Sequence, residues 1–84
     1  MSKIEKAIER LKSRPKDFTY DEMKMILNNF GFIEYNKGKT SGSRVEFRDE
    51  YGRKIVLHKP HPRNIIKSYM IRAILDNLNE WRLI

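Results

Sequence analysis

The first third of the chain carries two amphipathic helical patterns. Residues 2–13 place four apolar side chains at helical spacing between charged ones: Ile4, Ala7, Ile8 and Leu11. Pro15 ends this pattern, and residues 13–18 are expected to form a linker. The second pattern, from about residue 20 to residue 30, has its apolar stripe at Tyr20, Met23, Ile26, Leu27 and Phe30.

The second predicted helix has clear start and stop signals. Thr19 and Glu22 are spaced as a capping box, in which the hydroxyl and the carboxylate each accept a hydrogen bond from the other residue's backbone N–H. Phe18 and Met23 flank this cap as a hydrophobic staple. Gly31 follows the last apolar position and is expected to supply the left-handed residue that ends the helix.

Three short segments read as strands: residues 32–35, 44–48 and 53–58. The last two alternate apolar and polar side chains, and they are separated by Glu50-Tyr51-Gly52. A three-residue loop that ends in glycine is typical of a type I turn closed by a glycine bulge. The two segments are therefore predicted to form an antiparallel hairpin.

This turn predicts the register of the hairpin. Phe47 should face Ile55 and Val45 should face Leu57, which puts the apolar pairs on one face. The opposite face then pairs Arg48 with Lys54, Glu46 with Val56, and Arg44 with His58.

The remaining pattern completes the fold. Lys59-Pro60-His61-Pro62 is a stiff connector, and a final helix is expected from about residue 67 to residue 80, with Ser68 as its N-cap. The chain is predicted to be one α+β domain spanning residues 1–84, in the order α-α-β-β-β-α. Its helices should cover one face of a three-stranded antiparallel sheet, with residues 1–13 as an additional N-terminal helix.

Positive charge is concentrated in one stretch of the sequence. Residues 37–72 contain ten lysines and arginines against three acids, a difference of +7 that equals the net charge of the whole chain. So local an imbalance indicates a surface that faces a polyanion. The charge does not show whether that surface only binds nucleic acid or also cuts it.

Composition excludes several classes of chemistry. The chain has no cysteine, which excludes disulfides, thiol catalysis and cysteine-type zinc sites. His58 and His61 alone are too few for a metal site, so we expect no metal and no cofactor. No apolar run approaches the ~20 residues that span a membrane, and the N-terminus lacks an apolar signal core. We expect a cytoplasmic protein without a membrane partner.

Two runs resemble the HicA toxins, small bacterial proteins that cleave mRNA and are encoded beside a HicB antitoxin. One run is residues 36–47 (NKGKTSGSRVEF), and the other is residues 55–62 (IVLHKPHP), which leads into a helix containing residues 71–75 (IRAIL). The order of elements over residues 19–80 also resembles a double-stranded-RNA-binding domain. The resemblance implies an mRNA target and a HicB-like antitoxin, expected here to be acidic.

One position departs from the pattern of that family. Its typical members read Gly-Ser-His at the start of the second strand, with the histidine as the catalytic residue, whereas this chain reads Gly42-Ser43-Arg44. Since arginine stays protonated, it suits a phosphate clamp and not a general base. We therefore predict a displaced catalytic site, in which His58 is the base, Arg44 holds the phosphate and Ser43 positions it.

Further basic residues are predicted to contact RNA. They are Lys37, Lys39, Arg44, Arg48, Lys54, Lys59, His61, Arg63 and Lys67. Two other interpretations stay open at this point: a non-catalytic RNA-binding module on the same fold, and an interaction protein whose basic face binds an acidic partner. In both, His58 is a solvated strand residue.

Overall fold

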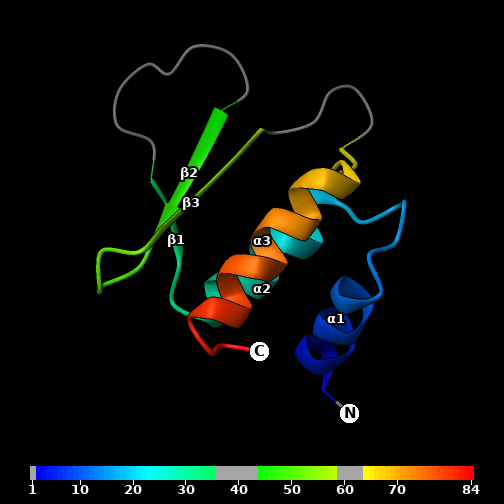
Figure 1. The fold of residues 1–84 in the computed structure, drawn as a ribbon, viewed down its shortest axis with the longest axis horizontal. Helices are drawn as coiled ribbons and strands as arrows, with labels where there is room; N and C mark the ends of the chain where they lie inside the picture. The colour runs from blue at the N-terminus through cyan, green and yellow to red at the C-terminus, as the bar shows by residue number, and fades with distance from the viewer. Residues whose placement is uncertain (1, 36–43, 59–63) are drawn as a thin grey trace.

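The computed structural model describes residues 2–35, 44–58 and 64–84 (Figure 1). The elements are α1 (Lys3–Lys12), α2 (Tyr20–Asn29), β1 (Ile33–Tyr35), β2 (Arg44–Arg48), β3 (Lys54–His58) and α3 (Ser68–Glu80). The strands form an antiparallel sheet in the order β1-β2-β3. The predicted α+β class and the predicted order of elements are confirmed.

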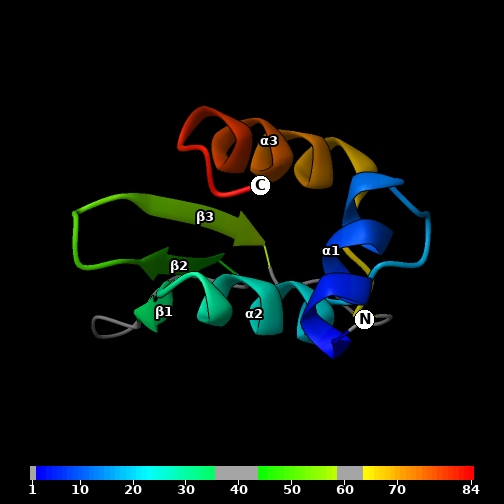
Figure 2. The same ribbon diagram turned by 90° about the horizontal axis from the view of Figure 1, so that it is seen from below.

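One face of the sheet is covered by α2 and α3. Figure 1 shows the sheet to one side of the two helices, and Figure 2 shows α3 beside β3 and α2 beside β1. Buried side chains fill the space between these layers: Val45, Phe47, Ile55 and Leu57 from the sheet, Met23, Ile26 and Leu27 from α2, and Ile71, Ile74 and Leu78 from α3. Burial of each such side chain contributes about 1.5–3 kcal/mol, so this layer carries most of the stability of the fold.

The ends of α2 form as the sequence predicts. The Thr19 hydroxyl accepts a hydrogen bond from the Glu22 backbone N–H at 3.2 Å, and Glu22 accepts one from the Thr19 backbone N–H at 3.1 Å. Gly31 is left-handed, with φ +92°, and the Phe32 N–H donates to the Leu27 carbonyl at 2.9 Å. This bond ends the helix and turns the chain toward the sheet.

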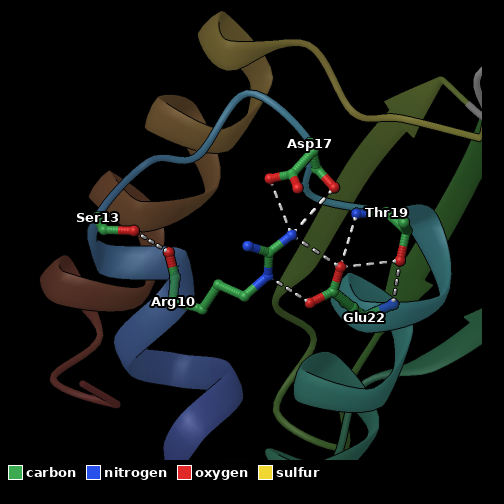
Figure 3. A network of polar contacts seen from close by, with 5 residues as sticks. All are labelled: Arg10, Ser13, Asp17, Thr19 and Glu22. Carbon is green, nitrogen blue, oxygen red and sulfur yellow. Dashed lines mark hydrogen bonds and ion pairs between the residues drawn. The ribbon is translucent and has the colours of Figure 1, made fainter.

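Arg10 joins α1 to the start of α2 (Figure 3). Its Nε donates to Glu22 at 2.8 Å, and its Nη2 donates to the Asp17 carboxylate at 3.0 Å. Burial acts to raise the pKa of the Glu22 carboxyl, but hydrogen bonds from Arg10 and Thr19 outweigh it, so this pKa lies below its ordinary value. The predicted linker, residues 13–18, thus takes part in the α1–α2 junction through Asp17.

α1 adds Ala7 and Leu11 to the hydrophobic core. Its first turn is closed by a second capping box, between Ser2 and Glu5, which the sequence analysis did not identify. α1 is therefore packed and capped as part of the fold.

The register of β2 and β3 is the predicted one. Phe47 pairs with Ile55, Val45 with Leu57, and Arg44 with His58. Gly52 has φ +81° in the turn, where a residue with a Cβ would be strained. The Asp49 carboxylate accepts hydrogen bonds from the Arg53 backbone N–H at 2.9 Å and from Arg53 Nε at 2.6 Å, which holds the two strands together at the turn.

Arg53 also connects the hairpin to the end of α3. Its guanidinium lies 5.3 Å from the Trp81 ring and 5.8 Å from the Phe32 ring. Phe32 and Trp81 stack at a centroid distance of 5.6 Å. The half-buried Trp81 thus packs against the core beside the hairpin.

Three predicted element starts need correction. Ser68 is not the N-cap of α3: Lys67 occupies that position without a side-chain cap. The chain before α3 is held to the start of α2 by a hydrogen bond from the Ile66 N–H to the Phe18 carbonyl at 2.8 Å, which fixes the helix start. β1 begins one residue after Phe32, whose N–H is used to end α2, and β3 begins one residue after Arg53, whose N–H is bonded to Asp49.

Candidate nucleic-acid interface

Arg44 and His58 lie directly opposite each other on β2 and β3, and both residues are exposed. Opposite residues of an antiparallel pair project from the same face of the sheet, with Cβ atoms about 4.5–5.5 Å apart. Next to them along the hairpin lie the pairs Glu46–Val56 and Arg48–Lys54. We call this side the outer face. The predicted juxtaposition of Arg44 and His58 is confirmed, and their chemical roles stay predictions.

The outer face continues onto β1. Ile33 pairs with Arg48, and Tyr35 pairs with Glu46, so both side chains project from this face. Ile33 is 70% exposed and Tyr35 is 38% exposed. The outer face therefore combines basic groups with apolar and aromatic surface. Sequence reasoning missed Ile33, because the register of β1 was not predicted.

β1 is oriented by its middle residue. Glu34 lies on the inner side of the sheet, where it accepts a hydrogen bond from the Tyr20 hydroxyl at 2.6 Å and pairs with Lys24 at 3.7 Å. Burial, and then the hydrogen bond to Glu34, raises the pKa of Tyr20. Since side chains alternate along a strand, Ile33 and Tyr35 must face outward.

The cations of the outer face differ in their partners. Arg48 is bound to Glu46, and its guanidinium lies 4.1 Å from the centroid of the Tyr35 ring. Arg44, Lys54 and His58 form no ion pair with any carboxylate in the described part of the chain. These three side chains are therefore available to a phosphate, whereas Arg48 is already committed to an internal contact.

Other predicted contacts lie beyond this face. Lys67 is exposed at the start of α3. The predicted catalytic residue Ser43 and the predicted RNA-binding residues Lys37, Lys39, Lys59, His61 and Arg63 lie outside the described residues. The roles given to them remain predictions.

Across residues 2–35, 44–58 and 64–84, no group of three or more histidine, cysteine, aspartate or glutamate side chains is placed to hold a metal ion. No helix in these ranges has the length and apolar character needed to cross a membrane.

An exposed guanidinium beside an exposed imidazole supports a definite chemistry. The guanidinium can donate two hydrogen bonds to a phosphate and stabilise charge that develops on it. An imidazole side chain can act as a general base, which a guanidinium does not do. A base and a phosphate-binding cation are two of the groups that take part in transesterification at a phosphodiester.

The model of a known protein family matches most of the chain. The family model described as "HicA toxin of bacterial toxin-antitoxin" matches residues 20–79. The matched region begins with α2 and ends within the last turn of α3, and it leaves α1 outside. No curated protein and no solved structure matches the chain.

Proposed function

The chain belongs to the HicA toxin family, and from this we propose that it is an mRNA-cleaving toxin whose site is the Arg44–His58 pair. Membership of the family implies an RNA target and an antitoxin partner in general terms. The observation that carries the proposal is the side-by-side position of an exposed guanidinium and an exposed imidazole, neither of which forms an ion pair with a carboxylate among the described residues. Arg44 stands where typical members of the family have a catalytic histidine.

The proposed reaction is an attack within the RNA strand. His58 accepts the proton of a ribose 2′-hydroxyl, and the freed oxygen forms a bond to the adjacent phosphorus. The bond from phosphorus to the 5′-oxygen breaks, and that oxygen takes a proton from water, which leaves a cyclic phosphate and a free 5′-hydroxyl. The hydroxide formed from the water takes the proton held by His58, which restores the neutral imidazole. Arg44 neutralises the charge on the phosphorus oxygens during the attack. Ser43, outside the described residues, is proposed to position the phosphate.

The remaining basic residues have a binding role in this proposal. Lys54 lies on the same face of β3 as His58, four residues before it. It is proposed to contact the RNA backbone on one side of the cleaved bond. Lys37, Lys39, Lys59, His61, Arg63 and Lys67 are proposed to contact the backbone on the other side. The antitoxin is proposed to be an acidic HicB-like protein, because the chain carries a net charge of +7. Cleavage of mRNA would take place in the cytoplasm.

A cleavage assay tests the catalytic roles. Purified protein is incubated with a transcript in the presence of a chelator, and initial rates are compared with those of His58→Ala, Arg44→Lys and Val56→Thr. His58→Ala is expected to lower the rate about 100-fold or more, since general base catalysis contributes about 10²–10⁴-fold. Arg44→Lys keeps the charge but loses the paired donors, so its rate should also fall.

Val56→Thr is the matched control, because Val56 lies on the same face and the same strand as His58 without a proton to exchange. Its rate should equal that of the wild type. Full activity of His58→Ala would end the proposal.

A second function is favoured by Arg44 itself. Because its guanidinium keeps its proton, replacing a histidine by arginine at this place removes a general base and strengthens binding of a phosphate. The chain would then be a non-catalytic RNA-binding module. This function is selected if the wild-type protein binds the transcript and leaves it uncut, and if binding weakens steeply as salt rises.

A further inference from the structure

A groove lies between the end of α1 and the beginning of α3. It is lined by Arg14, Ser68, Tyr69 and Arg72. A second hollow shares Arg14 and Arg72 with it and adds Lys12 and Asp76. Figure 2 shows the end of α1 close to the first turns of α3. Three cationic side chains and one carboxylate therefore border two neighbouring hollows, to which the region matched by the HicA family contributes only α3.

The three cations of this groove are not used by the fold. In the described part of the chain, no ion pair joins Lys12, Arg14 or Arg72 to a carboxylate. The contrast is Arg10 of the same helix, which is held by Asp17 and Glu22. Unpaired cations crowded around one hollow repel each other, so an anion bound there would lower the energy of all three.

The backbone fixes where Arg14 stands. It is the first residue after α1 in the left-handed conformation, with φ +51°, and its N–H donates to the Leu11 carbonyl at 3.0 Å. Leu11 is fully buried, so the turn that carries Arg14 is anchored to the core. The backbone that carries the Arg14 side chain is thus held rigidly beside α3, which lowers the conformational entropy lost when Arg14 binds a ligand.

Two properties of the groove favour RNA over a protein as its occupant. Protein interfaces need an apolar centre, and among the described residues the large exposed hydrophobic side chains lie mainly on the sheet and the hairpin turn: Ile33, Tyr35, Tyr51 and Val56. Tyr69 is the exposed one beside this groove, and the apolar side chains of the second hollow, Leu75 and Ile84, are buried or half-buried. The groove instead offers two guanidinium groups and a hydroxyl, which are common donors to phosphate oxygens. α3 also has no acidic residue in its first turn to oppose an anion.

We propose that this groove binds the sugar-phosphate backbone of the RNA that reaches the outer face, at a distance from the cut. The inference rests on the proposed function, because it takes RNA as the ligand. Figure 1 shows the end of β3, which carries His58, and the first turn of α3 toward the same end of the molecule. A strand lying across that end meets Arg44 and His58 first and then Arg72 and Arg14.

The chain contains a close control for Arg14. Arg82 is also exposed, also the second residue after a helix, and also left-handed, with φ +57°. Its N–H donates to the Asn79 carbonyl at 3.0 Å, as that of Arg14 does to Leu11. Arg82 does not line the groove between α1 and α3. Replacing either arginine by glutamine thus removes one charge from the same local backbone.

The test measures binding to a short labelled RNA whose 2′-hydroxyls are methylated, so that cleavage cannot interfere. Fluorescence anisotropy is recorded over a series of salt concentrations for the wild type, Arg14→Gln, Arg72→Gln and Arg82→Gln, and thermal melting confirms that each variant is folded. Arg14→Gln and Arg72→Gln should each weaken binding about three- to tenfold and lower the slope of log K against log salt by about 0.7. Arg82→Gln should bind as the wild type does.

The outcomes separate this inference from the proposed function. If Arg14→Gln and Arg72→Gln bind this RNA with the affinity and salt slope of Arg82→Gln, the groove is not an RNA site and the inference is wrong. The same holds if both variants keep RNA binding but lose binding to a purified HicB-like antitoxin. On unmodified RNA, both variants should have a higher KM than the wild type and the same kcat. If the wild-type protein does not cleave this RNA at all, only the catalytic proposal is refuted.

Discussion

The inner and outer faces of the β2–β3 hairpin are built from the same two strands, yet they have opposite surroundings. On the inner face, Val45, Phe47, Ile55 and Leu57 are buried against α2 and α3. On the outer face, Arg44, Lys54 and His58 are exposed and have no carboxylate partner in the described ranges. Alternation along a strand allows this separation, because neighbouring residues never share a face. The inner face thus determines stability, and the outer face is free to serve a ligand.

The largest effect is expected from breaking the inner face. Phe47→Ala removes a fully buried ring and leaves a cavity beneath the helices, which should lower the free energy of unfolding by about 3–5 kcal/mol. Urea denaturation followed by circular dichroism measures this loss. Val56 lies on the outer face of the partner strand, so Val56→Thr should change the free energy of unfolding by less than about 0.5 kcal/mol. Equal losses in the two variants would contradict the separation of the faces.

A smaller effect on stability is expected when one hydroxyl group is removed on each side of the sheet. Tyr20→Phe removes the donor to Glu34 on the inner side and should lower the free energy of unfolding by about 1–2 kcal/mol. Tyr35→Phe removes a hydroxyl from the exposed outer face and should lower it by less than about 0.5 kcal/mol. The same urea titration compares the two, and a larger loss in Tyr35→Phe would show that the sides are wrongly assigned.

The smallest effect on stability is expected at the turn between β2 and β3, and it appears only at acidic pH. Burial alone would raise the pKa of the Asp49 carboxyl, but hydrogen bonds from Arg53 outweigh it and hold this pKa below its ordinary value of 3.8. The unfolded chain therefore takes up this proton at a higher pH than the folded protein does. Its contribution to stability is present above the ordinary pKa and is lost as the pH falls through the lowered one.

Urea midpoints measured between neutral pH and strong acid check this dependence. The wild type should lose stability in that window, and Asp49→Asn should show a shallower decline because it has no proton to take up. The neighbouring Glu50→Gln is the control, since Glu50 is exposed and its side chain makes no hydrogen bond or ion pair in the described part. A decline in Asp49→Asn as steep as that of the wild type would remove Asp49 as its cause.

What the sequence predicts well here is local. The capping box of Thr19 and Glu22 is contained within four residues, and the hairpin register follows from Gly52 and the alternation on either side of it. These signals depend on backbone sterics and on side chains close in sequence. The pairing of Arg44 with His58 is a consequence of that register, so the centre of the candidate site was predictable as geometry.

What the sequence predicts poorly depends on distant contacts. Ile33 and Tyr35 face outward because Glu34 binds Tyr20, fourteen residues earlier. Ser68 fits an N-cap by residue type, but the segment before α3 is held by Phe18, so the cap falls on Lys67. The groove of Arg14 and Arg72 joins residues from opposite ends of the chain, and no short pattern marks it. The Ser2 capping box is different, because its signal was present in the sequence and was overlooked.

Trp81 gives the protein an internal reporter. It is the only tryptophan of the chain, and it lies where the end of α3 meets Phe32 and Arg53. Its fluorescence emission will shift when this contact opens, with no dye attached. The indole is on the helical side of the sheet and not on the outer face. Its emission should therefore change on unfolding and stay constant when a ligand binds to β2 and β3, so the two events can be recorded separately in one sample.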